Sequence, residues 1–325
     1  MRIHANQHRE NEEFQVRTAW LYYVEGLTQN AIAEYLGVTR LRVNRAIQDA
    51  MHNGIVSINI ISNFASCLEL EKKLKKQFKL DHVIVTPSPA NEINATKIVG
   101  AELSKYLGKI LKSNKMKLFG IGWGMTLNHA VRMIQPARRS RLEIISVLGG
   151  LPRGTEFNSF GVCSRLAESF SAQCTYLTLP VYASSKSSRD IILVQDVFKE
   201  VFNKMKHASG IVVGAGDMSK KSLLIKDGLP ADVKLVRLKE AGAVGHVLGY
   251  FLNAKGELLD HPINDRVLGL NPFEISGIEN RIIAAGGAYK KDILLAILRS
   301  GVFNVMITDQ RAAENIIRLS KNKRD

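Results

Sequence analysis

Hydrophobic residues near the N-terminus recur every three or four positions, which is the spacing of amphipathic helices. The pattern predicts three helices, over residues 14–26, 28–36 and 40–53, with breaks at Gly26 and Gly37. A threonine opens or precedes each of the last two helices, where its hydroxyl can accept a free backbone N–H. The expected inward faces are Val16, Ala19, Trp20 and Tyr23 in the first helix, Ile32, Ala33 and Leu36 in the second, and Val43, Ala46, Ile47 and Ala50 in the third.

The succession of a supporting helix, a second helix, a tight turn and a third helix is typical of a helix-turn-helix unit, whose last helix enters the DNA major groove. Arginine can bond guanine and asparagine can bond adenine there, although Arg45 could instead hold a phosphate. Residues at the start of the second helix can also contact phosphate. The alternative is a three-helix bundle used for protein contacts. The predicted DNA contacts are Thr28, Gln29, Thr39, Arg40, Arg42, Asn44 and Arg45.

Two further elements are predicted between this unit and the rest of the chain. The alternation of Val56, Ile58 and Ile60 indicates a short strand that could end the unit as part of a hairpin. Residues 67–79 have the pattern of a connecting amphipathic helix with Leu68, Leu74 and Phe78 buried. We therefore place a DNA-binding domain at 1–62 and a second domain at 63–325.

From His82 onward, apolar strands alternate with helical segments, a pattern that predicts an α/β domain with a mainly parallel sheet covered on both faces. Ligands bind such sheets beyond the carboxyl ends of the strands. The expected strands are 82–87, 117–124, 143–150, 175–181, 210–217, 281–287 and 303–309, and the expected helices are 94–113, 126–135, 158–172, 191–207, 289–300 and 311–321.

The best-defined loop is GIGWGMTL, residues 120–127, where a strand runs through glycines into the start of a helix. Glycines allow an anion to approach the backbone, and the N–H groups of the helix terminus can bind it. The spacing matches neither a dinucleotide fingerprint nor a Walker loop. Tight strand–helix packing is the alternative explanation. The candidate ligand-binding residues here are Gly122, Trp123, Gly124, Met125 and Thr126.

Other strand ends supply further candidates. The loop 148–158 contains Gly149, Gly150, Arg153 and Asn158, the segment 215–219 contains Asp217, and Lys290 begins a helix. Lysine suits phosphate as a point charge. His246 lies between glycines and can equally be structural, satisfied by one backbone bond. No paired acid and base is evident in the sequence, so the hypothesis of an enzyme lacks the acid–base pair that catalysis would use.

Composition limits the class of protein. Lysine and arginine outnumber aspartate and glutamate by 45 to 30, which favours an anionic partner such as nucleic acid or a phosphorylated ligand. No apolar run approaches the length of a membrane span, and the first residues do not resemble a signal peptide. Three scattered cysteines fit a reducing cytoplasm. We expect a cytoplasmic protein with no membrane partner, no metal and no cofactor.

The segment GLTQNAIAEYLGVTRLRVNRAI resembles the DNA-binding part of SorC-type regulators, bacterial sugar-responsive proteins grouped with the DeoR regulators. GWGMTL, LGGLP, GAVGHVLGYF, RVLGL, AAGGAYK and NVMITD follow in the family's order, so the resemblance covers roughly residues 14–320. It implies a Rossmann-like effector domain with the fold of sugar-phosphate isomerases, acting as a sensor, usually in a homotetramer. Gly124 and Thr126 would hold phosphate, Gly150 and Asn158 would line the sugar side, and Lys290 would contact the ligand.

Two departures from the family pattern bear on specificity. The family commonly has an acidic residue at the position of His246, and VSR in place of the VNR of the third helix. The expectation is a regulator of a carbohydrate or polyol operon that binds operator DNA and a phosphorylated sugar or polyol. The rivals are a constitutive DNA-binding protein whose large domain only oligomerises, and a sugar-phosphate enzyme.

Overall fold

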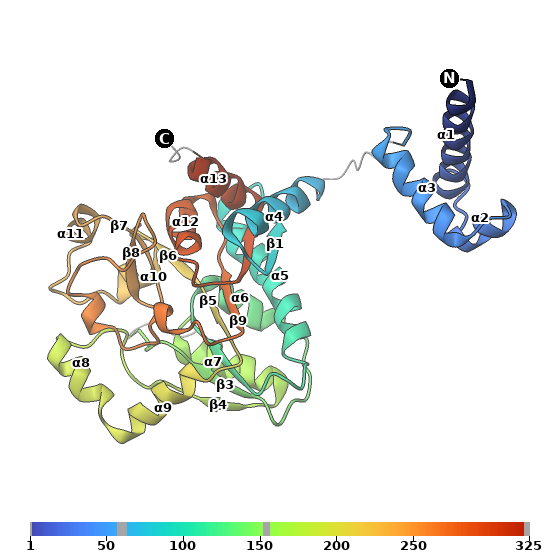
Figure 1. Cartoon of the computed structure of the whole chain (residues 1–325). Helices are drawn as coiled ribbons and strands as arrows, with labels where there is room; N and C mark the ends of the chain where they lie inside the picture. Colours follow the sequence, from blue (N-terminus) through green and yellow to red (C-terminus); the bar gives the residue numbers. More distant parts are fainter. Residues whose placement is uncertain (1, 57–63, 152–156, 322–325) are drawn as a thin grey trace. The chain divides into compact units, whose positions relative to one another are not determined.

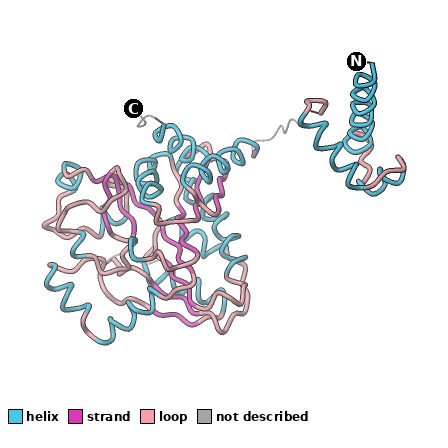
Figure 2. Tube along the Cα trace, in the orientation of Figure 1, coloured by secondary structure: helices cyan, strands magenta, loops and turns pink. Residues whose placement is uncertain are grey.

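The computed structural model describes residues 2–56, 64–151 and 157–321, and divides the chain into two compact units, Met1–Ile61 and Ser62–Asp325. Figure 1 labels their helices and strands. Figure 2 shows that, among the described residues, all strands belong to the larger unit. The strand expected at 56–60 lies outside the described residues, apart from Val56.

The smaller unit contains α1 (Arg2–Tyr23), α2 (Gln29–Tyr35) and α3 (Arg40–His52). The three predicted helices are confirmed, although α1 begins twelve residues before its predicted start at residue 14. The hydroxyl of Thr28 accepts the backbone N–H of Ala31 at 3.2 Å, and that of Thr39 accepts the N–H of Arg42 at 3.3 Å. Gly37 has a φ of +63° in the turn between α2 and α3. The core consists of Leu21, Ile32, Ala33, Val43 and Ile47.

The predicted inward face of α1 is wrong. Of its four residues only Ala19 is buried, while Val16 and Trp20 are 47% and 57% exposed. The buried face instead includes Gln15 and Thr18, and the side-chain amide of Asn53 donates to Gln15 Oε1 at 3.2 Å. The buried face of α1 thus combines Leu21 with the small and polar residues Ala19, Gln15 and Thr18, while Val16 and Trp20 face outward.

The larger unit is built on a seven-stranded parallel sheet with the order β1-β10-β9-β5-β2-β3-β4. This confirms the predicted α/β class. From β2 the chain continues outward to β3 and β4, whereas β5 is followed by β9 and β10 on the other side. The strands are β1 (His82–Thr86), β2 (Leu118–Ile121), β3 (Glu143–Ser146), β4 (Gln173–Thr175), β5 (Gly210–Val213), β9 (Asn280–Ala284) and β10 (Val305–Asp309).

Helices cover both faces of this sheet, so successive residues of a strand enter opposite cores (Figure 1). Val212 of β5 packs in one core, while Ile211 and Val213 pack in the other. The first core is closed by α5 (Ala95–Ile110), α6 (Met125–Met133) and α7 (Ser159–Phe170). The second is closed by α4 (Ala65–Phe78), α12 (Lys291–Ser300) and α13 (Gln310–Lys321). In α4 the prediction that Leu68 is buried is wrong, because Cys67, Leu70 and Leu74 form the buried face.

A second sheet of three antiparallel strands was not predicted. It consists of β6 (Ala215–Asp217), β7 (Ala243–Val247) and β8 (Tyr250–Asn253), and its first strand comes from the segment expected to continue β5. The strand expected at 175–181 is also largely irregular, since β4 ends at Thr175. The helix expected at 191–207 is two helices, α8 (Lys186–Leu193) and α9 (Asp196–Lys206). Short helices α10 (Leu223–Asp227) and α11 (Leu235–Glu240) precede β7.

Candidate functional site

A cavity of about 570 Å³ lies where the chain reverses its direction of travel across the parallel sheet. Its walls come from the loop between β2 and α6, the turn between β5 and β6, strand β7, and the residues just before α12. Strands β2 and β5 are neighbours, but the strands that follow them lie on opposite sides. Such a switch point is the usual ligand site of an open α/β sheet.

The start of α6 provides donors for an anion. Gly124 precedes the helix with φ +128° and ψ 173°, a conformation that essentially only glycine adopts. A Cβ on Gly124 would meet no atom within 4 Å, so the space in front of it is open. The first-turn N–H groups of a helix lack partners within the helix, and here they lie at the cavity beside the buried Thr126. Trp123 is oriented by its indole N–H, which donates to the carbonyl of Gly149 at 2.9 Å.

Lys290 contributes positive charge to the cavity. It lies at the end of a short helical turn, Ala288–Lys290, and its ammonium is 5.8 Å from the centroid of the Tyr289 ring. Burial lowers the pKa of Lys290 to about 8, an effect that the nearby carboxylates of Asp217 and Asp309 partly offset. The residue is therefore mostly a cation at neutral pH, and it loses its charge more easily than a surface lysine.

His246 forms a neutral, hydrogen-bonded part of the wall. Its Nε2 lies 3.1 Å from the hydroxyl of Ser222, and its ring packs edge-on against Phe251 with centroids 5.6 Å apart. A Cβ on Gly216 would overlap this ring, so the glycine makes room for the histidine. Burial, reinforced by the charge of Lys290, lowers the pKa of His246 to about 4. The imidazole is therefore uncharged at physiological pH.

The cavity brings together seven of the predicted ligand-binding residues, from four separate segments of the chain. Gly149, Gly150 and Asn158 do not line it among the described residues; the Asn158 side chain instead exchanges hydrogen bonds with the backbone of Leu151 at 2.8 and 2.9 Å. Gly122 is buried behind the loop, and Arg153 lies outside the described residues. The seven are Trp123, Gly124, Met125, Thr126, Asp217, His246 and Lys290.

Several polar residues of the wall were missed. Glu92, Thr96, Lys221 and Ser222 lie in segments without a glycine-rich motif, whereas Tyr289 lies within the AAGGAYK motif beside the predicted Lys290. Ser219 is nevertheless next to a predicted residue, since its backbone N–H donates to Asp217 Oδ2 at 3.0 Å. The missed polar lining residues are Glu92, Thr96, Ser219, Lys221, Ser222 and Tyr289.

The smaller unit presents its predicted polar residues on the outer side of α3. Arg40 and Arg45 are exposed, and the Arg42 guanidinium lies 4.6 Å from the centroid of the Phe14 ring. That contact links α3 to α1. Leu41, 78% exposed in the first turn of α3, was not predicted as a contact. A shallow hollow is lined by Thr28, Gln29 and Arg40, with Tyr22, Tyr23, Gly26, Leu27 and Asn30.

The described residues contain no group of three or more histidine, cysteine, aspartate or glutamate side chains placed to hold a metal ion. Within the same ranges, no helix combines the length and the apolar character needed to cross a membrane.

The chain is similar to known proteins over almost its whole length. Residues 62–318 match the family described as "Putative sugar-binding domain". The chain is 29% identical over 307 residues to the erythritol catabolism regulatory protein EryD of Brucella abortus, covering 94% of this chain and 97% of that protein. It is 31% identical over 313 residues to the transcriptional regulator LsrR of Escherichia coli O139:H28, covering 94% and 95%.

Solved structures have the same fold. A DeoR family transcriptional regulator from Listeria monocytogenes superimposes with a TM-score of 0.71 at 25% identity, covering 77% of this chain and 99% of that one. The full-length sorbitol operon regulator SorC from Klebsiella pneumoniae gives 0.70 at 21% identity, covering 93% and 97%. These relatives are regulators and not enzymes. The chain therefore belongs to the SorC-type, DeoR-like family of sugar-binding bacterial transcriptional regulators.

Proposed function

We propose that this regulator controls a carbohydrate or polyol catabolic operon from the cytoplasm, and that a phosphorylated sugar or polyol is its effector. The observation that carries the proposal is the meeting of Lys290 with the first turn of α6 in one cavity. A lysine and free helix N–H groups both favour an anion. The size of the cavity suits a small metabolite. EryD, whose name refers to erythritol catabolism, makes four-carbon polyols reasonable first probes.

The effector would be held at two ends. Its phosphate would lie against Gly124, Thr126 and Lys290, where the donors and the positive charge are. Its hydroxyl groups would meet Asp217, whose carboxylate accepts hydrogen bonds, and Ser222 and His246, which can donate or accept them. Gly122, Trp123, Met125, Gly149, Gly150 and Asn158 would shape or support this site, and Arg153 would join it from the loop that precedes α7.

Operator DNA would be bound by the smaller unit, with α3 in the major groove. Arg42, Asn44 and Arg45 would contact base edges, with Arg45 also able to hold a phosphate. Thr28, Gln29, Thr39 and Arg40 would position the backbone of the DNA, an assignment supported by the hollow that Thr28, Gln29 and Arg40 share. The exposed Leu41 would suit contact with a thymine methyl group.

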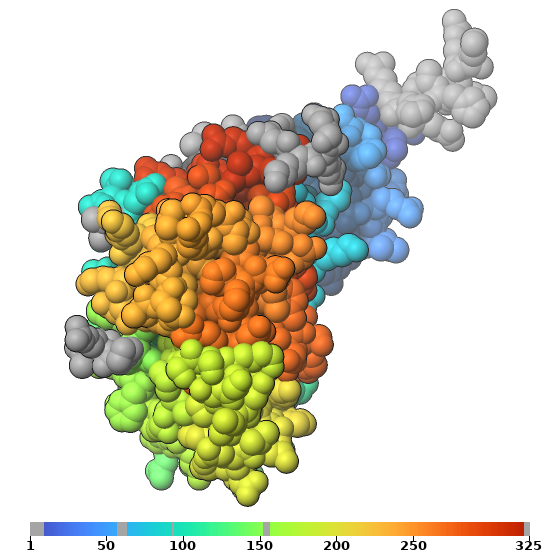
Figure 3. Space-filling view, turned by 90° about the vertical axis from the view of Figure 1, so that its left-hand side faces the viewer, coloured from blue at the N-terminus to red at the C-terminus, as the bar shows by residue number. Residues whose placement is uncertain are grey.

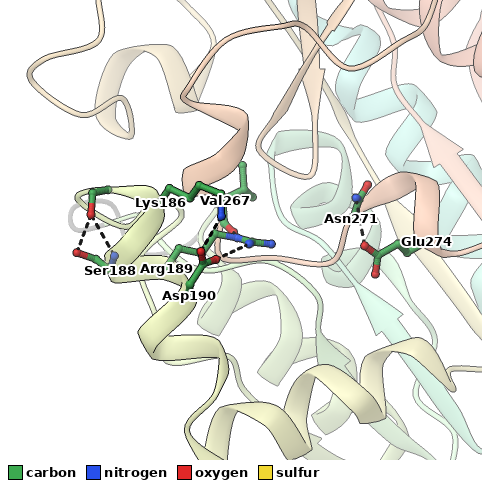
Figure 4. Close-up of polar contacts among 8 residues, drawn as sticks. Lys186, Ser188, Arg189, Asp190, Val267, Asn271 and Glu274 are labelled. Carbon is green, nitrogen blue, oxygen red and sulfur yellow. Dashed lines mark hydrogen bonds and ion pairs between the residues drawn. The ribbon is translucent and has the colours of Figure 1, made fainter.

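A homotetramer would present several reading units to paired half-sites. Exposed apolar side chains support such assembly. On α8 the polar contacts lie on one side: Arg189 donates to the carbonyl of Val267 at 3.1 Å, and Lys186 pairs with Asp190 at 2.7 Å (Figure 4). Ile191, Val194 and Val197 are more than 60% exposed. Figure 3 shows this side of the larger unit, with α8 and α9 in yellow-green and yellow.

The test is fluorescence anisotropy of the full chain on DNA from upstream of its own transcription unit, at fixed salt, with sugar and polyol phosphates and their unphosphorylated forms added in turn. Salt is fixed because phosphate contacts make affinity steeply salt-dependent. Selective binding that one phosphorylated compound changes supports the proposal. Selective binding that no compound changes supports the constitutive rival.

A further inference from the structure

Two of the three cysteines meet inside the larger unit, away from the cavity. Cys163 lies on α7 and Cys174 on the edge strand β4, and their sulfur atoms are 3.2 Å apart. Cys163 is fully buried, whereas Cys174 is partly accessible. The third cysteine, Cys67, lies on α4 in the core on the opposite face of the sheet.

The surroundings of the pair make the two sulfurs chemically unequal. The pKa of the Cys174 thiol is lowered, chiefly because it accepts a hydrogen bond from Cys163, with a further contribution from the hydroxyl of Tyr176. The same hydrogen bond, with burial, raises the pKa of the Cys163 thiol. Tyr176 is held in place by Phe160, whose ring stacks on it with centroids 4.7 Å apart. An accessible sulfur with thiolate character beside a buried second thiol is the arrangement of an oxidisable cysteine pair.

We propose that Cys174 and Cys163 form a peroxide-oxidisable thiol pair that closes to an intramolecular disulfide between β4 and α7. Cys174, as the thiolate, attacks one oxygen of hydrogen peroxide; the O–O bond breaks, and hydroxide leaves and becomes water on protonation. The product is a sulfenic acid on Cys174. The sulfur of Cys163 then attacks the Cys174 sulfur, the S–O bond breaks, and a second water carries away the Cys163 proton. In sum, two thiols lose two electrons and one peroxide becomes two waters.

The geometry favours closure within one chain. The sulfurs are already in contact across elements that are adjacent in the fold, since both α7 and β4 pack beside β3. Ten residues separate the cysteines in the sequence, so the bond would close a short loop. This inference concerns the larger unit alone and does not depend on the identity of the effector or on DNA binding.

The test is a peroxide titration of the reduced full chain, followed by alkylation of free thiols in denaturant and mass spectrometry. Trypsin cleaves after Arg165, between the two cysteines, so the disulfide links the peptide 154–165 to the peptide 166–186. We expect free thiols to fall from three to one per chain, the linked peptide pair to lose two mass units, and reductant to reverse both. The Cys67→Ser variant should form the same link.

Two variants test the assigned roles. In Cys163→Ser the sulfenic acid on Cys174 cannot be resolved, so dimedone should label Cys174 in this variant far more than in the wild type. In Tyr176→Phe, which keeps the aromatic ring, the pH–rate profile for alkylation of Cys174 should move to higher pH. Three free thiols persisting under peroxide, a link to Cys67, or a link only between chains on a non-reducing gel would overturn the proposal. Dimedone labelling of Cys163 in place of Cys174 in the wild type would also overturn it.

Discussion

The imidazole Nε2 of His246 and the hydroxyl of Ser222 lie 3.1 Å apart in the wall of the cavity. The histidine is neutral, because burial and Lys290 lower its pKa to about 4. The cavity of this chain therefore has one negative charge fewer than an acidic residue would give it. The charged side chains that line it are Glu92, Asp217, Lys221 and Lys290.

Effector binding should weaken as the pH rises through about 8. The pKa of Lys290 is about 8, so the ammonium is mostly charged at pH 7 and mostly neutral at pH 9. A phosphate monoester keeps its charge over this range, since its second pKa is about 6. We expect the Kd of a phosphorylated effector, measured by calorimetry, to rise toward about tenfold per pH unit above 8. The Lys290→Arg variant keeps its charge throughout and should give a flatter profile.

Replacing His246 should move the pH midpoint of the loss of effector binding, which the pKa of Lys290 sets near 8 in the wild type. In His246→Asp, a carboxylate beside the ammonium favours the charged lysine and raises its pKa. The weakening of effector binding should then begin above pH 8. His246→Gln is the matched neutral control and should leave the midpoint near 8. A midpoint that is the same in all three proteins would show that Lys290 does not govern binding.

Gly124→Ala should destabilise the larger unit by about 1–3 kcal/mol, because its backbone conformation is essentially restricted to glycine. No steric clash contributes, since the added Cβ meets nothing within 4 Å. The matched control is Gly108→Ala within α5, where the Cβ is equally free and helix propensity predicts a gain of about 0.5–1 kcal/mol. Urea unfolding followed by Trp123 fluorescence in a Trp20→Phe background reports on the larger unit alone. Equal changes in the free energy of unfolding in the two variants would contradict the backbone strain at residue 124.

Arg45→Ala should reduce operator affinity by about 1–3 kcal/mol if the side chain contacts a base edge. A phosphate contact would instead weaken binding to all sequences and lower the salt dependence by about one unit. Anisotropy at several salt concentrations separates the two. The control is Lys72→Ala, at an exposed position of α4, which should change neither the operator affinity nor its salt dependence. An Arg45→Ala protein with wild-type affinity would remove this residue from the interface.

Val194→Asp should lower the mass of the assembly in sedimentation velocity, because it places a charge on the apolar surface of α8 and α9. Val194 is 72% exposed and has Ile191 and Val197 nearby in the sequence. Val236→Asp is the matched control, since that valine is 58% exposed on α11. If both variants sediment like the wild type, this surface is not an interface between copies.

The second and third helices of the smaller unit were predictable almost residue by residue, because their threonine caps and the glycine turn between them are local signals. The face of α1 was not. Burial of Gln15 and Thr18 depends on how α3 approaches, and the periodicity of Val16 and Trp20 is the same whether they face in or out. Periodicity identifies a helix and its stripe, but tertiary contacts decide which side is covered.

The parallel sheet and the glycine loop were also predictable, because buried strands are continuous apolar runs. The second sheet was missed because residues 210–217 form one apolar segment, although the chain changes sheets at Gly214. This error also hid Ser222, which reaches His246 only through that second sheet. Asn158 was assigned to the ligand side, whereas its side chain bonds the backbone of Leu151, a pairing that loop composition does not reveal.

The most direct test compares operator binding by the wild type and by Lys290→Ala, each with and without the sugar or polyol phosphate that changes operator binding of the wild type. Without effector, the two proteins should bind the operator with equal affinity. Adding effector should change the operator affinity of the wild type by about 5- to 150-fold, and that of the variant little or not at all at the same concentration. If the variant responds with the same half-maximal effector concentration as the wild type, the placement of the effector beside Lys290 is contradicted.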